Sequence, residues 1–417
     1  MAFSLFSKKQ KQEKDSLFTE ESVFLTLDVG TEFIKSAIYR VNDNGAEIIG
    51  YSRVKQHSKA MEGAMVVNIE HVCSAADRGI GEALAVADKI LGEECPFPEF
   101  VTMGISGELV KGVSIVANYE RENPDERITH DELQDVVESV REQAFPDSIE
   151  DIAEEMGTSP NKIKEIMSHI DSTYIDGVKV DDPIGFTGEE VSYRVFSTFA
   201  PSLHINSLYE IADRLELEIL TIDVQPYAIA KMFKGSHKSD FSSIFIDVGG
   251  GTSDVALIQD GGILGTKMVA FGGRVFSRRI ATALNLELHD AEELKINYAL
   301  RKVQETTQKK VKVAIAKDAH LWSEAMEIAL EEFKEVESFP TEIHLSGGGS
   351  ELPELKEALM AYPWLTVLPF ERFPKINHIY PNQIEHIEDR TGMMIGTGDV
   401  APAALTSISF EHIKNLL

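Results

Sequence analysis

Short apolar runs that stop at a polar or glycine-rich turn recur along this chain. Ile244 to Ile246 is one such run; it stops at Asp247, and a second apolar run resumes at Val255. The turn between them reads Gly249-Gly250-Gly251-Thr252. Apolar runs of this length bounded by glycine are typical of buried strands. The pattern therefore predicts a strand, a glycine-rich turn and a second strand.

Two other segments repeat this pattern far away in the sequence. Near the start, the run from Val23 to Leu27 leads into Asp28-Val-Gly30-Thr31, and the following apolar run contains Lys35. Near the end, Glu342 to Ser346 leads into Gly347-Gly348-Gly349-Ser350 and then a predicted helix. Glycine lets the backbone N–H groups of such turns approach an anion closely. The alternative for each segment is a glycine-rich turn with no ligand.

Amphipathic helices are predicted between these strands. The apolar spacing indicates helices over Ala75 to Leu91, Ile205 to Leu215 and Ser323 to Val336. The fold class is therefore α/β. The sequence pattern changes between residues 108 and 198, where we expect a small α+β insert domain without a group of catalytic residues.

Within this insert, Thr129-His-Asp-Glu132 is a capping-box pattern that predicts a helix to about Ala144. The acidic stretch from Asp147 to Ile170 predicts two helices that are separated at Pro160. The stretch after Val191 alternates as a half-buried strand.

These segments divide the chain into predicted lobes, an insert, a helical subdomain and two tails. They are an N-terminal tail over 1–21, a first lobe over 22–107 and 199–226, an insert over 108–198, a second lobe over 227–270 and 341–406, a helical subdomain over 271–340, and a C-terminal tail over 407–417.

Composition narrows the classes of function. The chain has 417 residues, of which 43% are apolar and 26% charged, as in ordinary globular proteins with two or three domains. A net charge of −29 argues against nucleic-acid binding. Cys73 and Cys95 are too few and too far apart for a disulfide framework or a zinc site. With no apolar run long enough to span a membrane and no signal-peptide core, we expect a cytoplasmic protein.

The first residues form a local positive cluster with an apolar tip. Phe3, Leu5 and Phe6 precede Lys8 and Lys9. A segment of this kind can lie on an anionic membrane, where each lysine contributes about 1 kcal/mol. The alternative is a disordered terminus that binds nothing.

The turn residues suggest phosphate chemistry. The N–H groups of Gly30 and Thr31 can face phosphate oxygens, and Lys35 can supply a positive charge. Asp247 can hold a hydrated Mg²⁺ beside a polyphosphate. Gln225, just before Pro226, lies at a predicted helix start and can orient a water molecule. A helix N-cap is the alternative role for Gln225.

Glu292 and Lys295 lie three residues apart, on one face of a predicted helix. Their simplest interpretation is a surface salt bridge.

The three segments, in this order, resemble the phosphate and adenosine motifs of the actin/Hsp70 ATPase superfamily. Within it, the chain resembles the FtsA family of bacterial cell-division proteins in six short stretches. These are Gly104 to Gly107, Ile128-Thr129, Tyr174 to Gly177, Asp182 to Gly188, Phe271 to Gly273, and Ala291 to Lys295. The resemblance covers residues 22 to about 406.

The resemblance implies an actin-like ATPase fold with two duplicated, ribonuclease H-like lobes and an insert subdomain of the FtsA type. It implies ATP or ADP with Mg²⁺ held through water by Asp28 and Asp247, and at most slow hydrolysis assisted by Gln225 and Asp247. The implied nucleotide-binding residues are Asp28, Gly30, Thr31, Lys35, Gly249, Gly250, Gly251, Thr252, Glu292, Lys295, Gly347, Gly348, Gly349 and Ser350.

The resemblance further implies self-assembly into protofilaments on the inner face of the cell membrane at the division site. The implied partners are a tubulin-like division-ring protein and, through the insert, other division proteins. FtsA proteins usually end in a linker and a basic amphipathic helix; the end of this chain, Phe410 to Leu417, is short and mixed in charge. The N-terminal segment is the alternative anchor.

Two other functions compete on the same fold. One is a type IV pilus assembly adaptor, against which the stretch from Asp182 to Gly188 favours the division family. The other is a sugar or acetate kinase, which would need an acceptor pocket and a catalytic base that the sequence does not reveal.

Overall fold

The structure is a computed structural model that describes residues 22–62, 65–105, 110–180, 182–236, 238, 241–334 and 336–416. The predicted membrane-binding residues lie outside these ranges, as does Gly107; they are Phe3, Leu5, Phe6, Lys8 and Lys9. Among the described residues, none of the helices combines the length and the apolar character that a membrane crossing requires.

The first lobe is built on a six-stranded sheet with the strand order β11-β6-β1-β2-β3-β17. β1, β2 and β3 are antiparallel neighbours, whereas β6, β11 and β17 each run parallel to the strand beside them. The bounds are Val23–Val29 for β1, Phe33–Asn42 for β2, Gly45–Lys55 for β3, Phe100–Ile105 for β6, Glu218–Val224 for β11 and Ile387–Asp389 for β17. Helix α2 (Ile69–Leu91) packs on one face of this sheet.

The second lobe repeats the arrangement in a five-stranded sheet with the order β14-β13-β12-β15-β16. The bounds are Ser243–Val248 for β12, Ser253–Gln259 for β13, Gly262–Val269 for β14, Glu342–Ser346 for β15 and Lys375–His378 for β16. Apart from β17 at the edge of the first sheet, both lobes have the order third, second, first, fourth and fifth strand, counted along the chain. The predicted α/β fold with two duplicated lobes is thus confirmed.

Two helices, α6 and α12, each follow one lobe in the chain but pack against the other lobe. α6 (Gln225–Met232) follows β11 of the first lobe but packs against β12, β13 and β14 of the second. α12 (Val400–Leu416) comes after the second lobe but packs on β1, β2 and β6 of the first. Because β17 also pairs with β3, both β17 and α12 belong to the first lobe. The predicted boundary at 406 is therefore wrong.

The predicted C-terminal tail over 407–417 is also wrong, because residues 407–416 continue α12. Phe410 and Ile413 are buried in the core of the first lobe. The hydroxyl groups on this helix are satisfied across the interface, since Ser409 shares a hydrogen bond of 2.6 Å with Tyr39. Pairing of this kind lets a helix that carries serines be buried on most of its surface.

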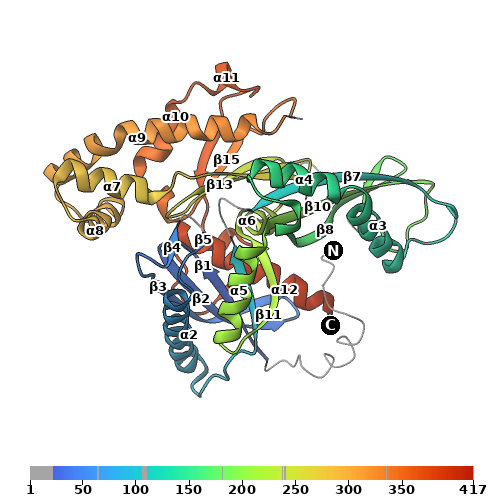
Figure 1. Cartoon of the computed structure of the whole chain (residues 1–417), viewed down its shortest axis with the longest axis horizontal. Coiled ribbons are helices and arrows are strands. Elements are labelled where there is room, and N and C mark those ends of the chain that lie inside the picture. The colour runs from blue at the N-terminus through green and yellow to red at the C-terminus, as the bar shows by residue number, and fades with distance from the viewer. Residues whose placement is uncertain are drawn as a thin grey trace.

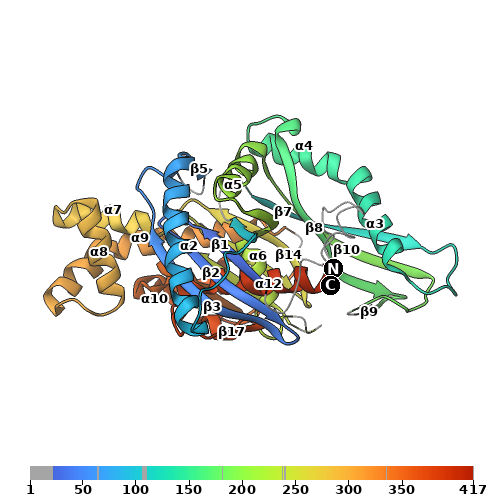
Figure 2. The same ribbon diagram turned by 90° about the horizontal axis from the view of Figure 1, so that it is seen from below.

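The insert forms a four-stranded sheet with the order β7-β10-β8-β9 and its own hydrophobic core. The bounds are Lys111–Glu120 for β7, Ile163–Ile175 for β8, Val178–Val180 for β9, Glu190–Pro201 for β10, His130–Gln143 for α3, Phe145–Glu155 for α4 and Pro160–Lys162 for the 3₁₀ turn η1. The insert and the helices α7 and α8 extend in opposite directions from the two sheets (Figures 1 and 2).

One predicted helix of the insert is a strand. Residues Ile163 to Ile170 belong to β8, and the register of β8 against β10 shifts at two places, opposite Thr198/Phe199 and Arg194/Val195. Each shift adds a residue to β8 and reverses which side chains face the core. Buried residues therefore recur at intervals of three and four, as in Ile163, Ile166 and Ile170, and imitate a helix. The capping-box helix is confirmed, with Thr129 as its N-cap.

A helical subdomain covers the second lobe. Its helices are α7 (Gly273–Leu284), α8 (Leu288–Ala299) and α9 (Glu305–Glu331). The helix predicted to begin at Ser323 is only the last third of α9, which ends at Glu331. The remaining elements are β4 (Met61–Glu62), β5 (Met65–Val66), α5 (Ser202–Arg214), η2 (Gly348–Glu351), α10 (Pro353–Ala361), α11 (Trp364–Val367), η3 (Pro381–Gln383) and η4 (Thr397–Asp399).

Candidate functional site

Asp28 is a buried carboxylate near the end of β1. Its Oδ2 accepts a hydrogen bond from Lys35 Nζ at 2.8 Å, and its Oδ1 accepts one from the side-chain amide of Gln225. Asp28 and Lys35 are direct partners across β1 and β2, so their side chains leave the same face of the sheet. Gln225 is the first residue of α6, with Pro226 behind it, as the sequence predicts. The structure thus brings these three residues together.

Asp247 lies at the corresponding end of β12 in the second lobe. Burial raises the pKa of its carboxyl group, and this outweighs the hydrogen bond from Ser346 and the positive charge of Lys35, which lower that pKa. Asp28 raises it as well. Ser346 donates to Asp247 Oδ1 at 2.6 Å. The turns that follow the two carboxylates meet between the lobes, since a Cβ atom built on Gly250 would lie 3.6 Å from the backbone nitrogen of Glu32.

The turn after Asp247 is bonded to the start of α7. Gly249 O accepts a hydrogen bond from the N–H of Gly273 at 2.9 Å, and Gly250 O accepts one from the N–H of Arg274 at 2.8 Å. A Cβ atom built on Gly272 would lie 2.6 Å from the carbonyl carbon of Gly251. Only glycine fits at this approach, so Phe271-Gly-Gly273 is a packing requirement of the turn.

Some of the predicted N–H donors are used inside the turns. Gly30 N–H donates to Phe33 O at 3.2 Å, and Gly249 N–H donates to Thr252 O at 2.9 Å, which closes each hairpin. Among the described residues, no hydrogen-bond acceptor pairs with the N–H groups of Gly250 and Gly251. These two N–H groups are therefore available to an anion.

The third turn packs directly beneath the second. Gly347 has φ of +82°, and a Cβ atom on it would lie 2.4 Å from Val248 O. Thr397 donates its hydroxyl to Gly347 O at 2.8 Å, and Ser350 donates its own to the same oxygen at 2.7 Å. Ser350 is fully buried, so its hydroxyl fixes the turn. Gly348 begins η2, where the first N–H groups have no partner within the helix.

The first and second turns meet through an ion pair between the lobes. The guanidinium group of Arg274 binds the carboxylate of Glu32 and donates to Thr31 O at 3.0 Å. A Cβ atom built on Gly250 would lie 2.6 Å from Glu32 Cγ. The turns at Gly30, Gly249 and Gly348 therefore surround one region between the two sheets.

A row of cations on β2 and β3 faces the second lobe. Lys35 pairs with Arg53 across the two strands, and Phe33 pairs with Lys55, so all four side chains leave one face. The Arg53 guanidinium stacks on the Phe33 ring at 4.0 Å and lies 3.8 Å from a Cβ atom built on Gly348. Arg53 makes no ion pair with any described residue. It is a free positive charge between the first and third turns.

Glu292 and Lys295 form a buried ion pair on α8, at 2.8 Å. Burial tends to raise the pKa of Glu292, but Lys295, the Ser277 hydroxyl and the charge of Lys55 outweigh it, and the pKa is lowered. Lys295 also donates to Gly273 O at 3.0 Å, next to the second turn. The surface salt bridge that the sequence alone suggests is thus a buried pair beside the glycine turns. Lys55 of the first lobe lies beside the same helix, with its Nζ 3.3 Å from Nδ1 of His289.

The carboxylates of the site fit a hydrated Mg²⁺ better than a fully protein-bound metal. Mg²⁺ usually keeps several waters and takes one or two carboxylates. Among the described residues, no group of three or more histidine, cysteine, aspartate or glutamate side chains is arranged to hold a metal ion. Asp28 already binds Lys35 and Gln225, and only one oxygen of Asp247 holds Ser346, so the other oxygen of Asp247 can accept from a metal-bound water.

Sequence reasoning missed several groups that the fold brings to this region. They are Glu32, Arg53, Lys55, Arg274 and Ser346. The alternation of Arg53 and Lys55 with buried Ser52 and Val54 was a usable signal for cations on one strand face. The role of Arg274 could not be predicted from nearby residues, because its partner Glu32 lies 242 positions away in the sequence.

A family model described as "Cell division protein FtsA" matches residues 244–386. The chain is 24% identical over 277 residues to the cell division protein FtsA of Neisseria meningitidis, which covers 66% of this chain and 61% of that protein. It is 24% identical over 281 residues to FtsA of Streptococcus pneumoniae, covering 67% of this chain and 56% of that protein. The matched part thus spans less than two thirds of these relatives.

Among solved structures, a chain of the PilM-PilN type IV pilus biogenesis complex aligns with a TM-score of 0.65 at 16% identity. The alignment covers 94% of this chain and 98% of that one. At this identity the likeness concerns the fold, which is the actin-like ATPase fold with two lobes and an insert.

Proposed function

From the likeness of this chain to the FtsA family of cell-division proteins, we propose that it binds ATP or ADP with Mg²⁺ between its lobes and acts in bacterial cell division. One observation carries the proposal. The turn after Asp28 and the turn after Asp247 meet from different lobes, where a Cβ atom on Gly250 would lie 3.6 Å from Glu32 N, and they bring Lys35 and the unpaired N–H groups of Gly250 and Gly251 to the same region. A phosphate chain is bound by N–H groups that have no acceptor within the protein and by a lysine ammonium. Two carboxylates can bind the waters of a hydrated Mg²⁺.

In this proposal the phosphates lie between the first two turns. Lys35 exchanges its bond to Asp28 for phosphate oxygens, and Asp28 and Asp247 hold waters of the Mg²⁺. The bound metal supplies charge neutralisation at the phosphate chain. Gln225 orients the attacking water through its amide while Asp28 fixes that amide. Because an amide is a poor base, hydrolysis is slow.

The nucleoside end lies toward α8 and the third turn. Glu292 and Lys295 contact the ribose or base, and Gly347, Gly348 and Gly349 give it a flat backbone surface. Ser350 and Thr252 act by holding their turns, since the Ser350 hydroxyl binds Gly347 O and the Thr252 hydroxyl binds Asp254. Arg53, free of carboxylates, adds a positive charge on the phosphate side.

The cellular role in this proposal is that of the FtsA proteins. The protein assembles into protofilaments on the inner face of the cell membrane and tethers a tubulin-like division ring. Its insert contacts other division proteins. It is peripheral and cytoplasmic, with Phe3, Leu5, Phe6, Lys8 and Lys9 as its anchor.

Nucleotide binding by the full chain tests the proposal. Isothermal titration with Mg-ATP should give one saturable site, and Asp247→Asn and Lys35→Ala should each weaken binding about tenfold or more, because each removes a charged contact. Asp213→Asn is the matched control, because Asp213 is exposed on α5 and its loss should leave the affinity unchanged.

Absence of binding, or equal binding by a folded Asp247→Asn variant, would refute the nucleotide site. If ATP binds but the protein neither sediments with a tubulin-like ring protein nor with vesicles, the division role fails while the nucleotide site stands.

The type IV pilus adaptor is the second candidate, because its fold covers nearly this entire chain. The two candidates differ in partner. Co-sedimentation with a tubulin-like polymer supports the division role, and retention by the cytoplasmic peptide of a pilus inner-membrane protein supports the adaptor. A small-molecule kinase is a third, less favoured candidate, and phosphoryl transfer across a panel of sugars and acetate tests it.

A further inference from the structure

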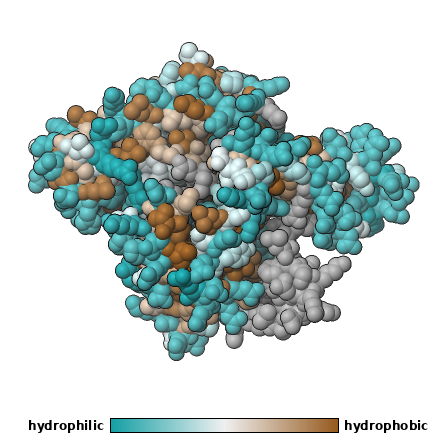
Figure 3. Space-filling view, viewed as in Figure 1, coloured by the Kyte–Doolittle hydropathy of each residue, from teal (hydrophilic) through white to brown (hydrophobic). Residues whose placement is uncertain are grey.

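The insert contacts both lobes. In the chain it follows β6 and precedes α5, so its two covalent connections lead to the first lobe. Side chains of the insert also contact the second lobe, and these contacts are noncovalent. The outer end of the insert, around α3, is covered by hydrophilic residues in the view of Figure 3. Because the insert touches two bodies, its contacts resist a change in the angle between them.

Two side chains of the insert donate hydrogen bonds to backbone oxygens of the second lobe. Ser114 of β7 donates its hydroxyl to Ile263 O on β14 at 2.9 Å. Lys179 of β9 donates from Nζ to Asp260 O at 2.6 Å. Asp260 lies in the turn between β13 and β14, and β13 begins directly after the glycine turn that follows Asp247. The insert therefore binds the hairpin that starts at the second turn of the candidate site.

The strands β7 and β14 approach each other closely at a glycine. A Cβ atom built on Gly112 would lie 2.8 Å from Thr266 Oγ1 and 2.7 Å from Cζ of Phe196. The carbonyl oxygen of Gly112 lies 3.8 Å from a Cβ atom built on Gly265. A larger residue at position 112 would force these groups apart, so glycine allows the insert to lie against the second lobe.

The insert also packs on the helix that carries Gln225. The ring of Phe196, on β10, stacks on the ring of Tyr227 with the centroids 4.9 Å apart and the planes at 10°. Both rings are buried. Tyr227 lies two residues after Gln225 in α6, which packs against β12, β13 and β14. The insert thus contacts the second lobe at the hairpin and, through α6, at a further place.

We infer that Ser114, Lys179 and Phe196 are positioning residues, through which the insert holds the two lobes at the angle where the three turns surround one region. This inference rests on the proposed nucleotide site. Contacts that favour the binding-competent angle raise the apparent affinity, because that affinity scales with the populated fraction of the competent state. By the same linkage, a partner that draws the insert away from β14 weakens nucleotide binding.

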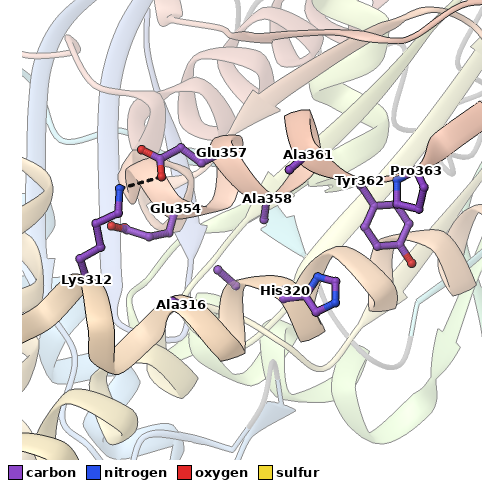
Figure 4. Close-up of a pocket in the computed structure, with 10 residues that line it drawn as sticks. Lys312, Ala316, His320, Glu354, Glu357, Ala358, Ala361, Tyr362 and Pro363 are labelled. Atoms are coloured by element: carbon purple, nitrogen blue, oxygen red, sulfur yellow. Dashed lines mark hydrogen bonds and ion pairs between the residues drawn. The ribbon is translucent and has the colours of Figure 1, made fainter.

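Helix α10 gives a fixed reference point on the second lobe. Leu355 and Leu359 are buried in the core of that lobe. Lys312 of α9 binds Glu357 of α10 at 2.8 Å, beside a pocket of about 350 Å³ between the two helices (Figure 4). Met360 is exposed on α10, so Met360→Cys can carry a nitroxide label while the buried face of the helix stays packed.

Distances between two nitroxides, measured by pulsed electron paramagnetic resonance on the full chain without nucleotide, test the contact. The second label is placed at Glu82→Cys, exposed on α2 of the first lobe, with Cys73 and Cys95 replaced by alanine. We expect one narrow distribution of the distance between the lobes. Ser114→Ala combined with Lys179→Ala should widen it, because both hydrogen bonds from the insert to the second lobe are lost.

Lys164→Ala is the matched control for the double variant. Lys164 of the insert donates to Asn206 of the first lobe at 3.1 Å, so its loss should leave the distance between the lobes unchanged. Ser114→Thr combined with Lys179→Arg keeps both donors and should retain the narrow distribution.

Isothermal titration with Mg-ATP measures the consequence for binding. Ser114→Ala combined with Lys179→Ala should weaken binding about threefold to tenfold, although neither side chain belongs to the candidate site. Phe196→Leu should also weaken binding, because it removes the ring that stacks on α6. Phe199→Leu is its control: Phe199 is equally buried but packs on Phe145 within the insert, so its loss should leave the affinity unchanged.

The inference is overturned if the double variant keeps a distribution as narrow as that of the unmodified protein, or if Lys164→Ala widens it equally. It is also overturned if Mg-ATP binds the double variant as tightly as the unmodified protein. If the unmodified protein binds no Mg-ATP, the proposed nucleotide site fails, and the distances measured without nucleotide still decide whether the insert holds the lobes together.

Discussion

Asp247 of the candidate site is a buried carboxylate that lowers the stability of the fold. Burial raises the pKa of its carboxyl group above the ordinary value of 3.8, so the folded state holds the proton more tightly than the unfolded state does. Stability must then fall as pH rises through the interval between 3.8 and the raised value. Asp247→Asn removes this loss and still accepts the hydrogen bond from Ser346.

We therefore expect Asp247→Asn to melt about 1–3 °C higher than the unmodified protein at pH 7 without nucleotide, and to show a flatter decline above pH 4. The measurement is thermal unfolding followed by circular dichroism across that pH range. A lower melting temperature for the variant at pH 7 would contradict the assignment of Asp247 as a destabilising buried charge.

The ion pair between Glu32 and Arg274 is expected to couple the two lobes. Both side chains are about one-fifth exposed, so the pair is stronger than a fully solvated one. A double-mutant cycle with Glu32→Gln and Arg274→Gln should give a coupling of about 1 kcal/mol in urea unfolding without nucleotide.

The matched control for this cycle is Arg390 with Glu47, a more exposed pair within the first lobe at 3.0 Å. Its coupling should stay below about 0.5 kcal/mol. Equal couplings for the two pairs would mean that the Glu32–Arg274 contact does nothing particular between the lobes.

Residues with a local signal could be predicted from the sequence, and residues without one could not. Asp28 and Asp247 each stand at a strand end beside glycine, a pattern that is visible within a few residues. Arg274 follows two glycines and looks like an ordinary helix residue until the fold brings Glu32 to it. The spacing of Glu292 and Lys295 predicted an ion pair. Their burial could not be predicted, because it depends on packing against α7.

At the scale of elements, the packing of α12 on the first lobe can be tested through Phe410. Phe410 is 3% exposed and contacts the ring of His386 at 5.5 Å. Phe410→Ala should therefore lower the free energy of unfolding by about 3–5 kcal/mol, as for other buried aromatic side chains. A free tail would show no such loss.

Lys414→Ala is the control on the same helix, because Lys414 is exposed; its effect should stay within about 0.5 kcal/mol. Urea unfolding of both variants gives the comparison. If the two variants unfold alike, α12 does not pack as described.

Elements with one regular period were predictable, whereas irregular or long-range ones were not. The helix that Thr129 caps was predicted because its start is encoded within four residues. β8 was not, because its register shifts give Ile163, Ile166 and Ile170 a helical spacing. The position of α12 depends on small and hydroxyl-bearing residues that pack against β1 and β2, such as Ser409 against Tyr39. The residues around Phe410 carry no pattern that predicts this packing.

For the whole molecule, the net charge of −29 opposes contact with an anionic membrane. Screening limits this repulsion to about 8 Å at physiological salt, so a local basic cluster can still bind where the rest of the protein is held away. Lys8 and Lys9 belong to such a cluster in the sequence. Membrane attachment should therefore depend on their charge far more than on the charge of other lysines.

Replacing both residues in one variant, Lys8→Glu with Lys9→Glu, should reduce co-sedimentation with vesicles of one-quarter anionic lipid by about tenfold or more, since each lysine contributes about 1 kcal/mol. A variant with Lys59→Glu and Lys334→Glu changes the net charge equally at exposed positions of the two lobes and should bind like the unmodified protein. If both variants lose binding alike, overall charge governs attachment and the N-terminal cluster is not the anchor. If neither loses binding, the anchor lies elsewhere on the chain or on a partner.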